Sequence, residues 1–332
     1  MSFKRKLLIL IVSLSLIFSI FSVVPTKTYA KNQSLYLGGI PSGFIIKPNG
    51  ALVIGLNEIV TKDGVFSPAK DADIKIGDII TKIGKDKISD MPSISKILNE
   101  SKGNPIEITV VRNGETIKKF LTPKQDIDGN YKLGVFIRDD LHGIGTITYF
   151  TDEGTFASLG HPILDNKGNK IDIKSGTAFL CSIIGISKGE KGKAGEIKGI
   201  FVEETKIGCI LKNTKTGLYG KVDKNYNFKN YPYMEISKAN MGDAQIYTCI
   251  DGVNPIKYSI SVVKIDNDNK DNKNFVIKIK DERLLSATNG ILQGMSGSPI
   301  IQDDKIIGAV THVFINDPTR GFGISIDKML EN

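Results

Sequence analysis

Short β-like segments separated by turn pairs fill the chain from Gly143 onward, and this pattern limits the possible folds more than any other feature. Pairs such as Lys188-Gly189 and Asp251-Gly252 supply the turns. Many strands at short intervals, with few helical stretches, are typical of an antiparallel barrel or sandwich. An apolar content of 40% and 34 glycines agree with a mainly β, loop-rich protein. The segments are 144–150, 155–159, 177–184, 195–203, 207–211, 217–222, 234–236, 245–250 and 274–280.

The preceding part of the chain, residues 34–126, combines short strands with one clear helix. Between 91 and 100, Ile94, Ile97 and Leu98 follow the i, i+3, i+4 spacing of a helix that packs on a sheet. Asn113-Gly114 lies between two alternating runs, which predicts a tight hairpin. Residues 129–140 are polar and are expected to bridge this part of the chain to the next.

Near the C-terminus, the tetrapeptide 294–297 (Gly-Met-Ser-Gly) places Ser296 between glycines, shortly before a predicted strand hairpin at 299–310. Glycine allows positive φ and a close approach of the backbone to a ligand. Two N–H groups of such a turn can point at one developing oxyanion, and the expected donors are those of Gly294 and Ser296. Most glycine- and serine-rich turns carry no chemistry, so a purely structural turn is the alternative.

The chain has three histidines that could act as the base for this serine: His142, His161 and His312. A hydroxyl is a poor nucleophile at neutral pH, and imidazole is the base best matched to it. His161 directly follows a strand-like run, where a barrel displays its catalytic groups, and is the preferred candidate. His142 lies in the polar bridge. His312 lies in an apolar strand, where a lone histidine is more often a core residue than a base.

The segment 294–299, Gly-Met-Ser-Gly-Ser-Pro, resembles the Gly-x-Ser-Gly-[Gly/Ser]-Pro segment of chymotrypsin-like serine peptidases. The longer run through 308–319 resembles the stage IV sporulation protein B (SpoIVB) family, PDZ-containing serine peptidases of spore-forming bacteria. The resemblance covers most of the chain after its N-terminal apolar segment. It implies a mainly β fold, with a PDZ domain at 34–126 followed by a chymotrypsin-like antiparallel β-barrel peptidase domain at 127–332.

Residues 69–84 carry the most specific match to a PDZ domain of the bacterial protease type. A PDZ domain binds an extended peptide by adding it as a strand to an open sheet edge. The expected peptide-binding loop, which would face the ligand carboxylate, is Leu37, Gly38, Gly39 and Ile40, and the 91–100 helix is the expected wall of the groove. The alternative is an ordinary turn at the glycine pair and a purely structural helix.

The resemblance also implies a catalytic triad of His161, Asp281 and Ser296. Segments 160–165 and 280–285 are similar to the family's catalytic histidine and aspartate regions. The acid of a triad holds the second ring nitrogen of the base and stabilises the imidazolium. Asp281 precedes Ser296 by only 15 residues, unlike the acid of typical chymotrypsin-like enzymes, so Asp165 and Asp243 stay open as alternatives.

Residues 1–30 are expected to be a signal peptide or a membrane anchor. Lys4-Arg5-Lys6 precede an apolar stretch at 7–24, which predicts that the body of the protein lies outside the cytoplasm. The length of this stretch lies between those of a signal-peptide core and a spanning helix. Thr28-Tyr29-Ala30 is an imperfect cleavage site, so removal and retention both stay open.

Charge and cysteine content argue against several other classes of protein. The net charge of +8 is not concentrated in any run, so nucleic-acid binding is not expected, whereas a weak attraction to anionic membrane lipid is. The cysteines Cys181, Cys209 and Cys249 are odd in number and not closely spaced, which argues against a disulfide framework and a structural zinc site. Their apolar contexts predict buried, inert thiols. No metal or cofactor is expected.

The resemblance implies a serine endopeptidase of the sporulation signalling pathway. It would cleave a regulatory partner of a membrane-embedded metalloprotease complex that controls a late sigma factor, and also itself. It would be exported, either membrane-anchored or secreted into the intermembrane space between forespore and mother cell. The alternatives are a non-catalytic PDZ scaffold with a degenerate protease-like domain, and a cell-wall or ligand-binding β-protein.

Overall fold

The computed structural model describes residues 33–88, 91–165 and 167–331. The predicted signal peptide or anchor at residues 1–30 lies outside this part of the chain. Among the described helices, none combines the length and the apolar character that crossing a bilayer requires.

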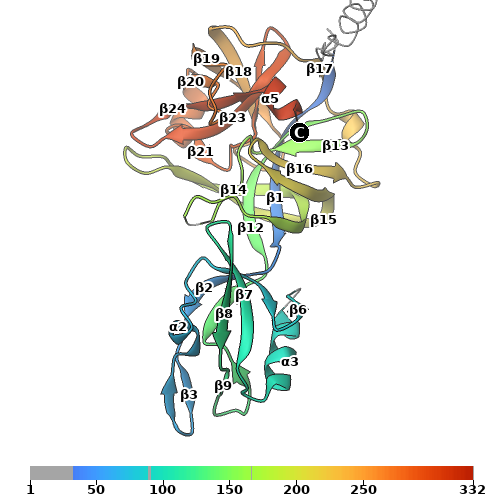
Figure 1. Cartoon of the computed structure of the whole chain (residues 1–332). Coiled ribbons are helices and arrows are strands. Elements are labelled where there is room, and N and C mark those ends of the chain that lie inside the picture. The colour runs from blue at the N-terminus through green and yellow to red at the C-terminus, as the bar shows by residue number, and fades with distance from the viewer. Residues whose placement is uncertain (1–32, 89–90, 166, 332) are drawn as a thin grey trace, which may run out of the picture. The chain divides into compact units, whose positions relative to one another are not determined.

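Six strands form the first barrel of the structure (Figure 1). Each strand pairs with the next in an antiparallel manner, and β1 pairs with both β14 and β12, which closes the ring. Buried apolar side chains such as Phe44, Ile147 and Leu218 fill its interior. In order around the ring the strands are β1 (Ser34–Pro48), β12 (Leu141–Phe150), β13 (Thr155–Ser158), β16 (Gly217–Val222), β15 (Gly195–Thr214) and β14 (Ile173–Ser187).

The second barrel is built from the C-terminal part of the chain and is also closed. Ile246, Ile277, Ile300 and Val310 belong to its buried core. The hairpin predicted after the serine turn is confirmed, because β22 and β23 pair across a tight turn at residues 303–304. In order the strands are β18 (Gly242–Thr248), β19 (Ile256–Ile265), β20 (Phe275–Ile279), β24 (Asp317–Ser325), β23 (Lys305–Phe314) and β22 (Pro299–Gln302).

Smaller elements complete these barrels. β17 pairs with the start of β1, and β21 runs parallel to the start of β15. Helix α4 leads toward the serine turn, and α5 closes the chain. They are β17 (Tyr233–Glu235), β21 (Leu292–Gln293), η1 (Phe228–Asn230), α4 (Glu282–Thr288) and α5 (Ile326–Leu330).

A separate sheet forms the PDZ domain, with strand order β11-β2-β5-β7-β8 and a helix, α3, at the predicted place. The Asn113-Gly114 hairpin is confirmed, with both residues at positive φ between β7 and β8. The elements are β2 (Ala51–Leu56), β3 (Ile59–Thr61), β4 (Gly64–Phe66), α2 (Pro68–Asp71), β5 (Ile79–Ile83), β6 (Asp86–Lys87), α3 (Met91–Ser101), β7 (Ile106–Arg112), β8 (Glu115–Leu121), β9 (Lys124–Gln125), β10 (Tyr131–Lys132) and β11 (Val135–Arg138).

The mainly β fold class is therefore confirmed, with a PDZ domain and antiparallel barrels, but the predicted domain boundaries need correction. The strand β1 (Ser34–Pro48) was assigned to the PDZ domain, yet it pairs with three strands of the first barrel: β12, β14 and β17. At the other end, β11 (Val135–Arg138) was assigned to the bridge, yet it pairs with β2 of the PDZ sheet. The PDZ domain is thus an insertion in the chain between the first and second strands of a barrel.

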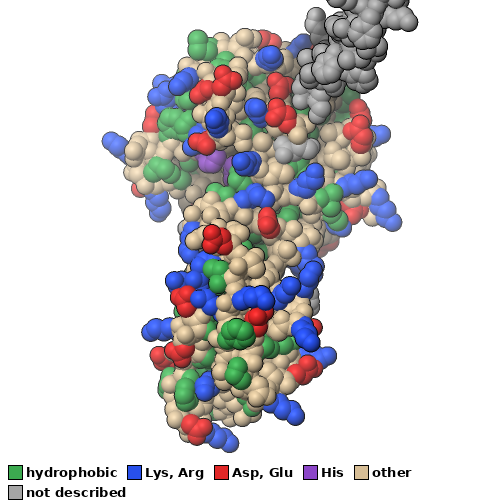
Figure 2. Space-filling model, in the orientation of Figure 1, with side chains coloured by type: hydrophobic (Ala, Val, Ile, Leu, Met, Phe, Trp, Pro, Cys, Tyr) green, Lys and Arg blue, Asp and Glu red, His purple; other side chains and the backbone are tan. Residues whose placement is uncertain are grey.

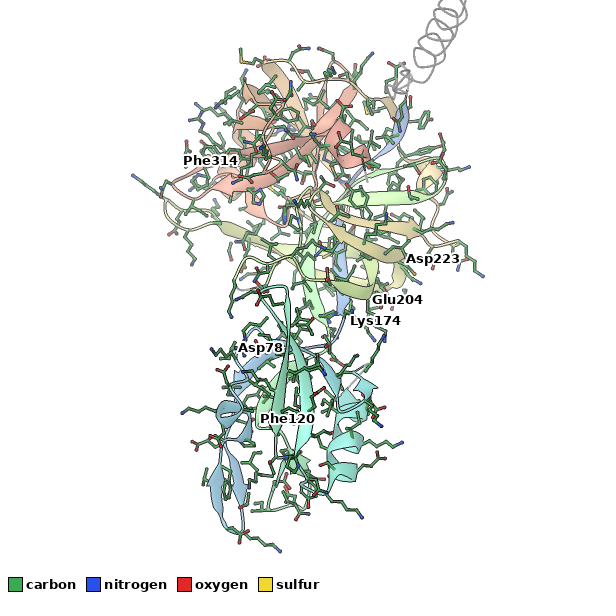
Figure 3. All side chains as sticks on the ribbon, in the orientation of Figure 1. Asp78, Phe120, Lys174, Glu204, Asp223 and Phe314 are labelled. Carbon is green, nitrogen blue, oxygen red and sulfur yellow. The ribbon has the colours of Figure 1, made fainter. Side chains whose placement is uncertain are left out.

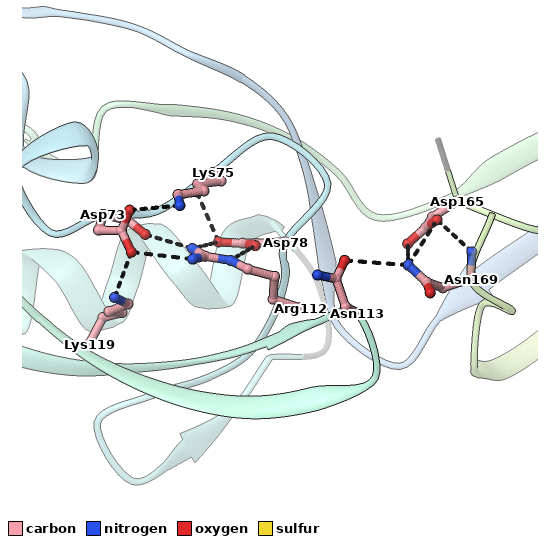
Figure 4. Close-up of polar contacts among 8 residues, drawn as sticks. All are labelled: Asp73, Lys75, Asp78, Arg112, Asn113, Lys119, Asp165 and Asn169. Carbon is pink, nitrogen blue, oxygen red and sulfur yellow. Dashed lines mark hydrogen bonds and ion pairs between the residues drawn. The ribbon is translucent and has the colours of Figure 1, made fainter. Parts of the chain in front are cut away.

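A cluster of ion pairs inside the PDZ domain joins the end of β7 to the residues that precede β5 (Figure 4). Asp78 directly precedes β5 (Figure 3), and its side chain is fully buried. Arg112, at the end of β7, donates from Nε to Asp78 Oδ1 at 2.7 Å and from Nη2 to Oδ2 at 2.8 Å. Asp78 also accepts from the N–H of Lys75, and Arg112 also pairs with Asp73. The buried carboxylate is therefore fully paired, as a buried charge must be.

Two of the three cysteines are buried as predicted, and the charges on one face of the surface (Figure 2) are spread as the sequence predicts. Cys181 and Cys249 are free and buried, but Cys209 is exposed, which corrects the prediction of three buried thiols. Cys209 lies on β15 at a position that points away from the barrel core, between buried Gly208 and Ile210. On the face drawn in Figure 2, basic and acidic side chains are interspersed.

Candidate active site

The turn that carries Ser296 is held in one conformation by its own backbone. Gly294 and Gly297 have φ of 100° and 93°, values that favour glycine. The N–H of Met295 donates to Leu292 O at 3.1 Å, and the N–H of Ser298 donates to Met295 O at 3.0 Å. The Met295 side chain is fully buried below the turn. Ser296 therefore sits on a rigid loop between β21 and β22.

Two threonines of β12 attach this turn to the first barrel. Thr146 donates from its N–H to Ser296 O at 2.9 Å and from Oγ1 to Gly294 O at 3.0 Å. Thr148 donates from Oγ1 to Gly297 O at 2.8 Å. A Cβ on Gly297 would lie 2.1 Å from Thr146 O, so only glycine fits against the strand. Sequence reasoning missed both threonines; their alternation within the apolar run of β12 was the available signal.

His161 lies directly after β13, at the end of a short loop in which Leu159 and Gly160 both have positive φ. Its Nδ1 is 2.9 Å from Pro162 O. Because a carbonyl oxygen can only accept, Nδ1 must carry the proton, and in the neutral ring Nε2 keeps its lone pair. Burial lowers the pKa of His161 below its usual value, and the Pro162 carbonyl opposes this shift. The ring is thus a neutral base with Nε2 available.

Ser296 and His161 line the same cavity, which has a volume of about 540 Å³. Gly294 and His312 also line it, and most of its other walls are apolar. The Ser296 hydroxyl donates to Thr311 O at 2.7 Å. The structure therefore brings the predicted nucleophile and the predicted base to one cavity, with the hydroxyl proton directed at a carbonyl of β23.

His312 is exposed, which corrects the expectation of a core histidine. It lies beside His161, with ring centroids 4.8 Å apart and planes inclined by 38°. Desolvation of its ring by the neighbouring side chains, and then the nearby His161 and Lys273, lower the pKa of His312 to about 4. A second neutral imidazole therefore covers one side of His161.

The predicted oxyanion donors are both at the cavity. Gly294 and Ser296 line it, and no acceptor in the described part of the chain takes a hydrogen bond from the N–H of Ser296. An N–H group that is already free of internal partners can bind a developing oxyanion at no cost of a broken bond.

Asp281 is not placed with the other two predicted triad members. Its side chain caps α4, accepting from the N–H of Arg283 at 3.0 Å, and pairs with the Arg283 guanidinium at 2.8 Å. It also accepts from the N–H of Ser259. The Arg283 hydrogen bonds lower the pKa of Asp281 to about 2. Asp281 lines a different cavity, together with Asp243.

The alternative carboxylates lie elsewhere too. Asp243 pairs with Lys280 at 2.7 Å. Asp165 accepts from Asn169 and from the N–H of Lys167, and its pKa is lowered in spite of partial desolvation (Figure 4). His142 lies on β12, 3.2 Å from Asp140, and lines the same cavity as His161. No carboxylate is among the described residues that line the cavity of Ser296 and His161.

The predicted peptide-binding loop of the PDZ domain is wrong. Leu37 and Ile40 are buried in β1, and the Gly38-Gly39 pair forms a bulge in its pairing with β12. A Cβ on Gly38 would lie 2.2 Å from Ile147 O, so this glycine serves close strand packing. These residues belong to the first barrel and cannot receive a ligand carboxylate.

The PDZ sheet offers another edge instead. β11 (Val135–Arg138) is the end strand of the sheet and has β2 as its one strand neighbour in the described chain. The residue before it, Gly134, has φ of 80°, and Leu133 is buried in a cluster with Ile94 and Leu98 of α3. The sequence signal was Leu133-Gly134-Val135-Phe136, which lay within the segment assigned to the polar bridge.

Comparisons with known proteins match both parts of the chain. A family model described as SpoIVB peptidase S55 matches residues 129–330, and a PDZ domain model matches residues 50–119. The regulator of sigma E protease of Haemophilus influenzae is 39% identical over 69 residues, which are 21% of this chain and 15% of that relative. The crystal structure of the inactive form of the Rv3671c protease is 13% identical, covers 57% of this chain and 81% of that chain, and has a TM-score of 0.29.

Proposed function

Because the chain belongs to the SpoIVB peptidase S55 family, we propose that it is a serine endopeptidase in which Ser296 is the nucleophile and His161 the general base. The observation that carries the proposal is that these two side chains line one cavity, while Nδ1 of His161 lies 2.9 Å from Pro162 O, which leaves Nε2 as the basic nitrogen. The rigid, glycine-framed turn presents the Ser296 oxygen to that cavity.

The proposed reaction is acyl transfer. The Ser296 hydroxyl leaves Thr311 O, gives its proton to Nε2 of His161, and attacks the peptide carbonyl carbon. The N–H groups of Gly294 and Ser296 stabilise the oxyanion. The intermediate collapses when the C–N bond breaks and His161 returns the proton to the leaving amine. Water, deprotonated by His161, then hydrolyses the ester and restores Ser296.

A carboxylate could act as the third member of the triad only after a rearrangement. Asp281 is the acid that the family resemblance implies, and it would have to exchange its Arg283 ion pair for the His161 ring. In the described state the Pro162 carbonyl occupies Nδ1 and performs the orienting part of that role. It lacks the negative charge that would stabilise an imidazolium.

The pH dependence of activity shows whether Pro162 O or a carboxylate holds Nδ1 of His161 in the active enzyme. With the pKa of His161 lowered by burial, the base stays neutral as the pH falls below the ordinary histidine value of about 6.5. We therefore expect the acid limb of kcat/KM to have its midpoint below pH 6.5. The measurement is kcat/KM for a peptide substrate between pH 4 and 8, beside the NMR titration of His161. A midpoint above pH 6.5 would show that a carboxylate reaches the ring in solution.

We assign substrate capture to the free edge of β11. An extended peptide could add there as a new strand, with its C-terminal carboxylate at the backbone N–H groups around Gly134. Phe136 on this strand is 57% exposed and available for contact with a ligand. Such capture would raise the local concentration of a tethered substrate at the peptidase site.

Two glycines with the same conformation test this assignment. A Cβ on Gly134 (φ 80°) would lie 2.8 Å from Asn57 O, whereas one on Gly114 (φ 82°), at a hairpin tip, would meet nothing within 4 Å. Gly114→Ala should cost about 1–2 kcal/mol of stability through backbone strain, and Gly134→Ala should cost more, because its Cβ also meets Asn57 O. Only Gly134→Ala should weaken binding of a fluorescent peptide with a free, apolar C-terminal residue, by at least about 10-fold in Kd, roughly 1.4 kcal/mol.

Fluorescence anisotropy measures the binding, and a C-terminally amidated peptide controls for carboxylate recognition. Equal affinities of the Gly134→Ala and Gly114→Ala proteins would place the peptide site elsewhere.

The proposed biological role follows the family resemblance. The peptidase would act in the sporulation signalling pathway, outside the cytoplasm, on a regulatory partner of a membrane metalloprotease complex. It would be membrane-anchored, or secreted into the space between forespore and mother cell. Self-cleavage would fall before Ser34, because a cut within β1 (Ser34–Pro48) would remove a strand of the first barrel. The N-terminus of the purified protein tests whether residues 1–30 are removed.

The alternative is a non-catalytic PDZ scaffold, which is favoured because none of the described residues that line the cavity is a carboxylate. A fluorophosphonate probe separates the two, because it forms a covalent bond only with an activated serine. The wild-type protein should be labelled at Ser296 and the Ser296→Ala protein should not. Absence of labelling in a folded wild-type protein would favour the scaffold.

A further inference from the structure

We infer that Asn213 is a positioning residue for the general base, a role that rests on the proposed function. Asn213 lies near the end of β15, and its side chain is only 6% exposed. It is neither in the serine turn nor among the residues that line the cavity. Asn213 lies beside the loop that follows His161 and contacts it at Ile163 and Ile171.

The Asn213 amide makes three hydrogen bonds to that loop. Its Oδ1 accepts from the N–H of Ile163 at 2.9 Å. Its Nδ2 donates to Ile163 O and to Ile171 O, each at 2.9 Å. The two ends of the loop are also joined directly, since the N–H of Ile171 donates to Ile163 O at 3.1 Å. The amide therefore fastens both ends of the segment that begins two residues after the base.

The link from Asn213 to the base passes through one peptide group. The N–H of Ile163 and the carbonyl of Pro162 belong to the same planar unit, so fixing the N–H fixes the direction of the C=O. That carbonyl is the acceptor for Nδ1 of His161 at 2.9 Å. A hydrogen bond at the N–H also polarises the C=O and strengthens what it accepts. Asn213 thus holds the group that keeps the Nε2 of His161 free to take the Ser296 proton.

A merely structural asparagine would leave the tautomer of His161 unchanged, so the two roles can be separated. Asn274 supplies the matched control. It is fully buried, donates to Asp266 O and Asn267 O, and accepts from the N–H of Ser325. Removing either amide therefore deletes three comparable hydrogen bonds to backbone groups, but only Asn213 is connected to the base.

The experiment compares Asn213→Ala and Asn274→Ala in the full chain. We expect Asn213→Ala to lower kcat at least 10-fold with KM changed less than 3-fold, and Asn274→Ala to keep kcat within 2-fold of the wild type. Nitrogen-15 NMR should show His161 protonated at Nδ1 in the wild type and in Asn274→Ala, and a mixture of tautomers in Asn213→Ala. Thermal melts should show similar losses of stability for both variants.

Equal kcat values and the same His161 tautomer in the two variants would overturn the inference. If Asn213→Ala fails to fold, the wild-type spectrum still decides, because protonation of His161 at Nε2 would contradict the proposed link. Fluorophosphonate labelling of wild-type Ser296 is measured in parallel. If wild-type Ser296 is labelled but the His161 tautomer is the same in both variants, only the role of Asn213 is disproved. If wild-type Ser296 is not labelled, the proposed peptidase activity is disproved.

Discussion

Replacing Ser296 with alanine should lower kcat for a peptide or casein substrate by about 10⁴-fold or more, because the attacking oxygen is lost. His161→Ala should cost about as much, and the double variant little more than either single one, since the two groups act as a unit. The readout is the rate of casein degradation together with kcat and KM for a peptide. Ser261→Ala in β19, whose hydroxyl makes a single 3.3 Å bond to Gly242 O, is the control and should retain activity.

The same variants test self-processing. The N-terminus of protein purified after wild-type expression should lie at or before Ser34, and Ser296→Ala should abolish any cleavage that is autocatalytic. Processing that continues unchanged in Ser296→Ala would assign the cut to another peptidase. Casein degradation by Ser296→Ala at the wild-type rate would exclude Ser296 as the nucleophile.

Asp281→Asn belongs to this series and tests the triad acid. Asparagine caps a helix about as well as aspartate, so α4 should be retained while the charge is lost. If Asp281 moves to His161 during catalysis, kcat should fall by about 10³–10⁴-fold, as expected for loss of the triad acid. We expect instead a kcat within a few-fold of the wild type, because Pro162 O already orients the base in the described state. A fall of about 10³–10⁴-fold would show that Asp281 replaces Pro162 O at the His161 ring during catalysis.

Breaking the buried ion pair of the PDZ domain should have the largest effect on stability. Asp78→Ala leaves the Arg112 guanidinium, 12% exposed, without its bidentate partner. We expect a loss of about 3–5 kcal/mol in the free energy of unfolding of the PDZ domain, because the mostly buried guanidinium then keeps only the half-exposed Asp73 as a partner. The paired variant Asp78→Leu with Arg112→Met should recover much of that loss, since neither charge then stays buried alone.

Urea denaturation measures both variants, and the exposed pair of Lys118 with Glu107 supplies the control. At 66% exposure of Lys118, its replacement by alanine should change stability by only about 0–1 kcal/mol. A loss below about 1 kcal/mol for Asp78→Ala would contradict the dominant role of burial. The peptidase activity of the Asp78→Ala protein toward a short peptide should persist, because no residue of this cluster lines the cavity of Ser296.

Several features of the site could be predicted from local sequence. The Ser296 turn, the hairpin after it and the Asn113-Gly114 turn all depend on residues within a few positions of each other, where glycine and asparagine allow positive φ. Helix α3 was predicted from the spacing of Ile94, Ile97 and Leu98. The choice of His161 among three histidines also rested on its own neighbourhood, directly after a strand.

Other features depend on pairings between distant residues, which no local pattern encodes. β1 pairs with β12 across the whole inserted PDZ domain, for example Tyr36 with Phe150, and this register decides that Gly38-Gly39 lies in a barrel. Asn213 accepts a hydrogen bond from the N–H of Ile163, 50 positions away, and Thr146 forms hydrogen bonds with the serine turn. These contacts form only when the barrels close. An amide or hydroxyl in a strand carries no sign of its partner in the sequence.

Residues close together in the chain were sufficient to predict the turn at Ser296 and the place of His161 after a strand, because turn geometry and residue type act over a few positions. Which strands enclose those residues, and where the carboxylates lie, could be seen only in the folded structure. Asp281 shows the reason: its side chain takes the partners that folding brings nearest, the Arg283 guanidinium and the N–H of Ser259. Hydrogen-bond and charge pairing over long sequence distances depend on the assembled fold.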